Sequence, residues 1–288
     1  MLIAPSLLTL LLTLPASPSY RAEIEQYRRA RVAELTADDG WLTVAGLFWL
    51  KAGANTAGSD PRSGIVLPAK APRRIGVFTF DNAAVTFHAA PGVRVTAGDM
   101  PVTVFTFDPG KDDDSAIRVG DLTMFVIRRG RRLAVRMRDQ ESDARRRFRG
   151  LEYFPIRPEY RVVARFVAYR TPKHLPIPNV LGETVDMEAP GYVEFVLHGR
   201  TWRLEPVYET AEHKDLFFIF KDGTSGHGTY GAGRFLHADL PRNGKVVVDF
   251  NKAYNPPCAF TAFATCPLPP RQNQLPIGIE AGELNYRH

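Results

Sequence analysis

From Gly53 to the C-terminus, short apolar or alternating stretches are separated by turn-forming residues. The stretches have the length of strands, and the turn signals recur roughly every 8 to 12 residues, as is typical of an antiparallel sandwich or barrel. Strands are predicted at residues 65–67, 76–80, 84–87, 93–96, 102–107, 123–127, 133–137, 160–169, 191–197, 201–207, 216–220 and 245–250. The pattern therefore predicts a mainly β fold built of sandwich-like or barrel-like antiparallel sheets.

One segment near the N-terminus has a helical pattern instead. Residues 20–35 place one stripe of side chains at the spacing of an α-helix, and turn-forming residues end the pattern at Gly40. The stripe consists of Ile24, Tyr27, Arg28, Arg31 and Leu35. The following segment, residues 41–50, is apolar on both faces of any strand. We therefore expect it to be buried between this single N-terminal helix and a sheet.

The strand pattern suggests a division of the chain near residue 150. We expect the helix and a first β lobe at residues 20–150 and a second β lobe at residues 151–288, with one large β domain as the alternative. A chain of 288 residues can bury a core in either arrangement. Residues 171–178 contain three prolines and are interpreted as a linker that crosses between strands.

The first residues form a candidate leader. Residues 2–16 are an apolar run, and small residues follow up to Ser19. The run has the length of a signal-peptide core and is too short and too proline-broken for a membrane-spanning helix. We expect residues 1–19 to be a signal peptide and the mature protein to be exported, to the periplasm or beyond, without a transmembrane segment. Because no Lys or Arg stands near Met1, the alternative is a misassigned start codon and a cytoplasmic protein.

Composition and charge add one constraint on partners. The chain has 44% hydrophobic and 24% charged residues, as soluble globular proteins do, and its formal charge is 37 − 31 = +6. Arginines at residues 128–132 and 145–149 supply much of this mild excess, and Asp139, Glu141 and Asp143 lie among them in the sequence. We interpret the arginines as a solvated, salt-bridged face and expect no nucleic-acid partner.

A glycine-rich loop occupies residues 222–234. Its glycines allow backbone amides to approach a ligand closely. The loop lacks the strand-to-helix context and the Gly-Lys-Ser/Thr ending of a P-loop, so that mode of nucleotide binding is excluded. Thr224 and Ser225 are candidate nucleophiles if a base lies nearby, and the alternative is a tight turn held by Asp222. His227 is interpreted as an exposed loop residue.

The last candidate region begins at Asp249 and combines prolines with the only two cysteines of the chain. Because proline fixes φ, the prolines hold Cys258 and Cys266 at defined positions. In an exported protein the two cysteines could form a disulfide, whereas in a reduced compartment they would be thiols or half of a metal site. Arg234 is the expected ion-pair partner of Asp249, and Glu280 or Glu283 is expected to return toward this loop.

The motifs Asp222-Gly-Thr-Ser-Gly226, Thr229-Tyr230, Gly233-Arg-Phe-Leu236, Asp249-Phe-Asn-Lys-Ala-Tyr-Asn-Pro-Pro-Cys-Ala-Phe260, Ala264-Thr-Cys-Pro-Leu-Pro-Pro270 and Ala281-Gly-Glu283 occur together in this chain. In this combination the chain resembles the bacterial and archaeal DUF1684 family over about residues 36–286. The resemblance implies membership of a family whose activity is not established. It directs attention to these loops without saying what they do.

A fainter resemblance concerns residues 58–68, which are similar to the glycine-to-strand segment of forkhead-associated β-sandwiches. Those domains read phosphothreonine through an Arg just after the glycine and a later Ser-x-x-His. Here Ser59 follows Gly58 and no such Ser-x-x-His appears. The resemblance therefore implies a similar fold, without phosphopeptide binding.

Three functions remain open. The first is binding of a small ligand or metal at residues 249–283. The second is an enzyme, with a hydrolase as the candidate class, that uses the same region and the glycine-rich loop. The third is a structural or interaction protein in which a Cys258–Cys266 disulfide is a staple. The cofactor is unknown. The candidate catalytic residues are Asp249, Cys258 and Glu283, with Thr224 or Ser225 as alternative nucleophiles. The candidate metal ligands are Cys258 and Cys266. The candidate ligand-binding residues are Asp222, Thr224, Ser225, Tyr230, Arg234, Asn251, Tyr254 and Asn255.

Overall fold

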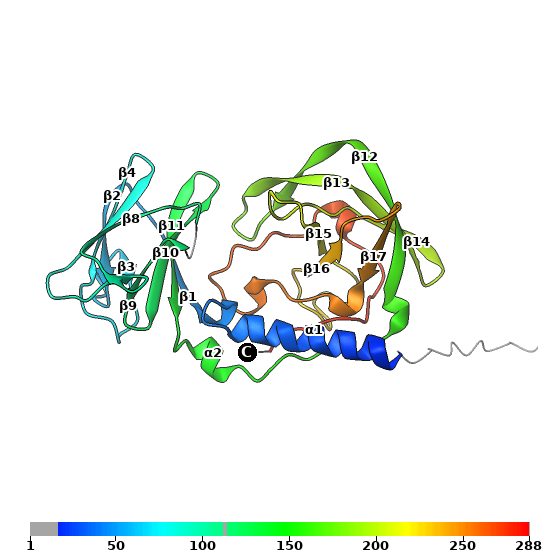
Figure 1. Cartoon of the computed structure of the whole chain (residues 1–288), viewed down its shortest axis with the longest axis horizontal. Coiled ribbons are helices and arrows are strands. Elements are labelled where there is room, and N and C mark those ends of the chain that lie inside the picture. Colours follow the sequence, from blue (N-terminus) through cyan, green and yellow to red (C-terminus); the bar gives the residue numbers. More distant parts are fainter. Residues whose placement is uncertain (1–16, 112–113, 288) are drawn as a thin grey trace, which may run out of the picture.

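The computed structural model describes residues 17–111 and 114–287 and confirms the predicted mainly β fold with one long N-terminal helix. The apolar run of the predicted leader, at residues 2–16, lies outside the described residues. Figure 1 shows two groups of strands side by side, with the helix α1 (Pro18–Thr36) running beneath the second group. Among the described residues, no helix combines the length and the apolar character needed to cross a bilayer.

The first group of strands is a sandwich of two sheets. One sheet has the order β3-β2-β4-β5-β8 and the other the order β1-β11-β10-β9-β6-β7. Side chains from both sheets, such as Phe78, Phe87, Met124 and Val135, form one buried cluster. The strands are β1 (Val44–Trp49), β2 (Gly53–Gly58), β3 (Ile65–Val66), β4 (Gly76–Asp81), β5 (Ala84–Ala89), β6 (Thr96–Ala97), β7 (Met100–Pro101), β8 (Val104–Phe107), β9 (Ala116–Val119), β10 (Leu122–Arg129) and β11 (Arg132–Asp139).

The second group of strands surrounds an apolar hairpin. A four-stranded sheet has the order β14-β13-β12-β17, and β15 pairs with β16. One face of β15 contributes Phe218 and Phe220 to one buried cluster, while Phe217 and Ile219 belong to another. Because both faces are buried, β15 is apolar almost throughout. The strands are β12 (Arg161–Pro178), β13 (Thr184–Leu197), β14 (Arg200–Leu204), β15 (Asp215–Phe220), β16 (Arg234–Asp239) and β17 (Lys245–Asp249).

The predicted linker at residues 171–178 is wrong, because this segment is the second half of β12 and pairs with β13. A register shift lies between Ala168 and Lys173, and beyond it Pro176 and Pro178 are paired with residues of β13. β17 pairs only with residues 161–165 of β12. The prolines therefore lie where β12 is an edge strand, the place in a sheet where a missing N–H group is tolerated.

Helix α1 precedes the first sandwich in the chain but is anchored to the second group of strands. Its Ser17 N-cap accepts a hydrogen bond from the backbone N–H of Tyr20, and Ile24 and Leu35 are fully buried. Tyr27 Oη donates to the carbonyl of Lys252 in the 3-10 helix η4 (Phe250–Lys252). The helix therefore forms one wall of the region in which the C-terminal motifs lie.

The arginine-rich hairpin between β10 and β11 faces the second group of strands. Arg129 Nε donates to Thr265 Oγ1 at 2.7 Å, and Arg132 forms an ion pair with Glu183 at 2.7 Å while stacking on Trp49. In the short helix α2 (Asp143–Arg147), Arg146 pairs with Asp143. These arginines accordingly have protein partners, as a salt-bridged face requires.

Candidate functional site

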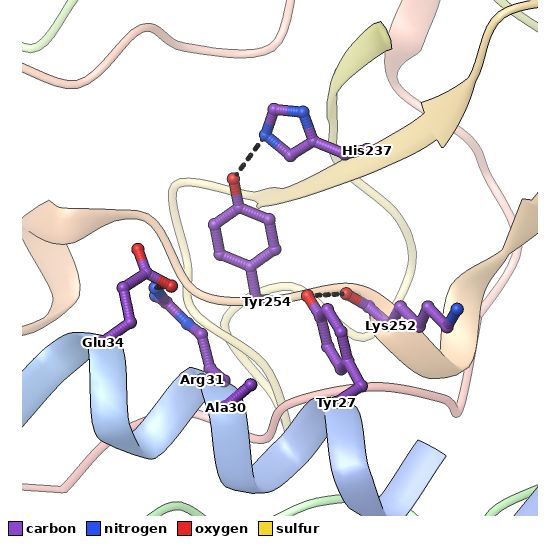
Figure 2. Close-up of a pocket in the computed structure, with 7 residues that line it drawn as sticks. All are labelled: Tyr27, Ala30, Arg31, Glu34, His237, Lys252 and Tyr254. Atoms are coloured by element: carbon purple, nitrogen blue, oxygen red, sulfur yellow. Dashed lines mark hydrogen bonds and ion pairs between the residues drawn. The ribbon is translucent and has the colours of Figure 1, made fainter. Parts of the chain in front are cut away.

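A cavity lies between α1 and the segment that follows β17. It has a volume of about 420 Å³ and is lined by Tyr27, Ala30, Arg31 and Glu34 of α1, His237 of β16, Lys252 of η4, and Tyr254. Figure 2 shows Tyr254 at its centre, between His237 on one side and the helix residues on the other. Volumes of this size are ordinary for small-molecule sites. We call this cavity the helix pocket.

The floor of the helix pocket is a buried ion pair. Arg31 is 5% exposed, and its Nε donates to Glu283 Oε1 at 3.2 Å. The other carboxylate oxygen of Glu283 accepts from the backbone N–H of Asn255 at 2.8 Å, and Arg31 Nη2 donates to the Asn255 carbonyl. The Arg31 guanidinium also lies 4.6 Å from the centre of the Tyr254 ring. These contacts fix the backbone and the ring on either side of the pocket.

Burial has opposite effects on the two members of this ion pair. It raises the pKa of Glu283 above its usual range, because removal from water disfavours the carboxylate, and Arg31 opposes that shift. For Arg31, burial acts to lower the pKa, but Glu283 and Glu34 together hold the guanidinium pKa above its ordinary value. Arg31 therefore keeps its positive charge, and this charge favours the ionised form of Glu283.

A chain of three side chains reaches the pocket from the strands. Tyr254 Oη lies 2.9 Å from His237 Nε2, and His237 Nδ1 lies 2.9 Å from Asp215 Oδ2. Burial raises the pKa of Tyr254 well above its usual value, with the nearby Glu209 adding to the shift, so the phenol keeps its proton. When Tyr254 donates to Nε2, a neutral His237 carries its proton on Nδ1 and donates it to Asp215.

The glycine-rich loop is held together by its own polar side chains. Asp222 Oδ1 accepts from both the backbone N–H and the Oγ1 of Thr224, each at 2.6 Å, and Ser225 Oγ accepts from the Asp222 backbone N–H. Thr224 Oγ1 is also 2.9 Å from Thr229 Oγ1. This geometry is that of the tight turn held by Asp222, which was one of the two alternatives predicted for the loop.

The predicted Arg234–Asp249 ion pair is wrong, because Arg234 pairs with Asp222 at 2.6 Å and both side chains are fully buried. The register of the hairpin explains this choice. Phe220 of β15 faces Arg234 of β16, so Asp222, two residues beyond the strand, lies beside the arginine. Asp249 instead accepts from Tyr20 Oη at 2.9 Å on both carboxylate oxygens and from the Asn251 backbone N–H.

The two cysteines face each other as thiols. The backbone N–H of Cys258 points to Cys266 Sγ at 3.1 Å, and that of Cys266 points to Cys258 Sγ at 3.4 Å. Tyr230 Oη donates to the Cys258 carbonyl. Within the described residues, no cluster of three or more His, Cys, Asp or Glu side chains has a metal-binding arrangement. Two sulfurs are half of the donors that a structural zinc takes.

The predicted site residues thus fall into four places. Tyr254 lines the helix pocket, and the neighbouring Asn255 bonds to Glu283. Asp249 and Asn251 meet at Tyr20. The glycine-loop network consists of Asp222, Thr224, Ser225 and Arg234, and the cysteine pair, Cys258 and Cys266, has Tyr230 beside it. His227 lies in the exposed part of the glycine loop. Their catalytic, ligand and metal roles stay predictions.

Sequence reasoning missed the part of the pocket that lies on the strands. Asp215, His237 and Glu209 carried no recognised motif, and β16 was not predicted at all. The register of the β15–β16 hairpin, in which Phe217 pairs with His237, brings Asp215 to the histidine, and Glu209 approaches it from the loop before β15. Tyr27 and Arg31 did carry a signal, since both belong to the predicted stripe of the helix.

The comparison with family models supports the resemblance seen in the sequence over residues 146–284, a shorter range than the predicted residues 36–286. The model of a family described as protein of unknown function (DUF1684) matches residues 146–284. The solution structure of an uncharacterized protein from gene locus rrnAC0354 of Haloarcula marismortui is 33% identical, with 49% of this chain and 78% of that chain covered and a TM-score of 0.41.

A second solved structure, the FhaA FHA domain complexed with the intracellular domain of Rv3910, is 17% identical, with 32% of this chain and 97% of that chain covered and a TM-score of 0.23. No curated protein sequence has a significant match to the chain.

Proposed function

Because residues 146–284 belong to DUF1684, a family of unknown function, we propose a function from the site itself: the protein binds a small polar molecule in the helix pocket. The observation that carries the proposal is the placement of Tyr254, which lines a cavity of about 420 Å³ and whose hydroxyl lies 2.9 Å from His237 Nε2. Concave sites with a few fixed polar groups are the usual form of small-molecule sites.

The pocket offers a ligand both aromatic surface and hydrogen-bonding groups. Tyr27 and Tyr254 supply ring faces, while Lys252, with a side chain 28% exposed, and Glu34, with one 64% exposed, supply opposite charges at the rim. The buried Arg31–Glu283 pair beneath them keeps the Tyr254 ring in place. Preorganisation of this kind lowers the entropy cost of binding.

The proposal is tested by thermal-shift screening of the purified full chain against a library of small polar metabolites. The expected result is a saturable rise in melting temperature with one chemical class of compound, and a loss of at least tenfold in affinity in Tyr254→Phe. The matched control is Tyr230→Phe, which also loses one hydrogen bond, to the Cys258 carbonyl outside the pocket. Equal affinity in both variants would count against the helix pocket.

One observation favours a second candidate, an enzyme that uses the same pocket. Tyr254, His237 and Asp215 have the arrangement of a hydroxyl, a base that can accept its proton and a carboxylate that orients the base. In such a step, Tyr254 takes a proton from a substrate hydroxyl or water while handing its own proton to His237 Nε2. Asp215 then stabilises the imidazolium.

The enzyme candidate predicts a split between binding and turnover. In a screen of ester, phosphate-ester and glycoside substrates, His237→Gln should lower kcat by a hundredfold or more, in line with general acid–base catalysis, while KM changes little. Turnover that is unaffected by His237→Gln would remove this candidate and leave the binding proposal in place.

A further inference from the structure

The two cysteines close the base of a loop that we call the docking loop, residues 258–266. The backbone N–H of each cysteine points to the sulfur of the other, at 3.1 and 3.4 Å, although the residues are eight positions apart. Neither cysteine lines the helix pocket. The contact therefore needs an explanation of its own.

The residues between the two cysteines hold the two groups of strands together. Thr261 Oγ1 donates to the carbonyl of Val44 in β1 at 2.9 Å, and Arg129 Nε of β10 donates to Thr265 Oγ1 at 2.7 Å. Arg136 Nη2 of β11 reaches the Phe263 carbonyl at 3.5 Å. All three contacts join the docking loop to the six-stranded sheet of the N-terminal sandwich.

The same loop also packs on helix α1 through its apolar side chains. Phe260 is 2% exposed and belongs to one buried cluster with Leu35 of α1 and with Leu42. A change in the mobility of the docking loop would therefore reach both the helix and the sandwich.

The two thiols differ in a way that suits thiol–disulfide exchange. Cys266 is 5% exposed, while Cys258 is only partly buried. The hydrogen bond with Cys266 lowers the pKa of the Cys258 thiol below its usual value, and the same interaction, with burial, raises the pKa of Cys266. Cys258 is thus the sulfur that a dissolved oxidant can reach and the one that more readily becomes a thiolate.

We propose that Cys258 and Cys266 are a redox pair whose oxidation to a disulfide locks the docking loop against the N-terminal sandwich. The oxidant is a low-molecular-weight disulfide. The Cys258 thiolate attacks one of its sulfurs and releases one small thiol, and Cys266 then attacks Cys258 Sγ and releases the second. The protein loses two electrons and two protons, and the small disulfide takes up all four as it becomes two thiols.

A covalent link changes the loop more than the present hydrogen bonds do. Thiols are weak donors and acceptors, so the reduced loop can open at its base, whereas a disulfide fixes both ends of a short segment. Because Thr261 and Thr265, which lie between the two cysteines, contact β1 and β10, slower opening of the base should protect those strands as well.

The test is hydrogen exchange of the full chain, followed by mass spectrometry, after equilibration with reduced or oxidised glutathione. Oxidation should make the protein lighter by two hydrogen atoms without a glutathione adduct. It should also slow exchange at least fivefold in residues 259–265 and in β1. The Cys258→Ser, Cys266→Ser double variant should exchange identically in both buffers.

One further variant separates the lock from the mere presence of a disulfide. Thr261→Val leaves both cysteines intact and removes the hydrogen bond to Val44, so it should still form the disulfide but lose the redox-dependent protection of β1. The proposal is overturned if glutathione disulfide yields no internal bond in the wild type. It is equally overturned if the bond forms and exchange in β1 does not change.

Discussion

Arg31 and Glu283 are 252 positions apart in the chain and form an ion pair whose side chains are 4% and 0% exposed. The pair joins the N-terminal helix to the last motif of the chain, Ala281-Gly-Glu283. It also sets the position of Tyr254, because Arg31 lies beneath the tyrosine ring and bonds to the Asn255 carbonyl. The helix is therefore a part of the candidate site rather than an appendage to it.

Removing the cation should strongly destabilise the protein. Arg31→Met keeps a long side chain in the helix but leaves the Glu283 carboxylate buried without its partner, which typically costs about 3–5 kcal/mol. The measurement is the free energy of unfolding in denaturant. Glu34→Gln is the control, since it removes the exposed partner of the same arginine and should cost no more than about 1 kcal/mol. Similar losses in both variants would contradict a buried role for the pair.

The Arg31→Met variant should also lose stability as pH rises. Burial already raises the folded-state pKa of Glu283, and loss of the guanidinium raises it further. A carboxyl with a raised folded pKa stabilises the fold below its unfolded pKa of about 4.3, and this stability is lost as pH rises through the folded value. Unfolding free energies measured from pH 4 upward should fall more steeply for Arg31→Met than for the wild type. Parallel profiles would show that Glu283 does not sense Arg31.

The second buried ion pair gives a matching prediction for the glycine loop. Asp222→Asn leaves Arg234, which is 0% exposed, without a counter-charge and should cost about 3–5 kcal/mol. Asp60→Asn is the control, because the ion-pair partners of Asp60, Arg62 and Arg73, are 85% and 81% exposed, so this change should cost far less. The measurement is the free energy of unfolding of both variants in denaturant. A mild effect in Asp222→Asn would indicate that the loop tolerates the arginine without its counter-charge.

Gly282 is required where the chain passes close to the loop after η4. Its φ is +82°, and a Cβ there would lie 2.4 Å from the Ala253 carbonyl oxygen. Gly244 also has a positive φ, +69°, but nothing lies near the position of a Cβ. Gly244→Ala therefore measures only the cost of a left-handed backbone at a non-glycine residue, about 1–2 kcal/mol. Gly282→Ala should therefore melt well below Gly244→Ala in a thermal unfolding scan. Equal melting temperatures would show that the Ala253 carbonyl moves aside freely.

Oxidation of the cysteine pair should raise global stability as well as local protection. Closing a loop of about nine residues removes unfolded-state entropy worth roughly 2–3 kcal/mol. The oxidised wild type should unfold at a higher denaturant concentration than the reduced wild type, with no difference for the double serine variant. A disulfide that lowers the midpoint would mean that the bond distorts the docking loop.

Local patterns predicted the classes of the elements but not the partners of their side chains. Alternation and turn residues indicated the β fold, and the stripe through Tyr27 and Arg31 indicated the helix. The pairing of Phe217 with His237 could not be read from the sequence, since register depends on the whole packed sheet. The same limit explains the wrong partner chosen for Arg234, and the prolines of β12 were mistaken for a linker because its edge position is a tertiary property.

The most direct test of the helix pocket is to fill it. Ala30→Phe places a ring in the cavity from an exposed position of α1, while Ala33→Phe makes the same change on the same helix at a residue that does not line it. Native mass spectra of the full chain should be recorded with a compound that raises the melting temperature of the wild type. The account predicts a bound mass in the wild type and Ala33→Phe and none in Ala30→Phe. Equal binding by both variants would contradict it.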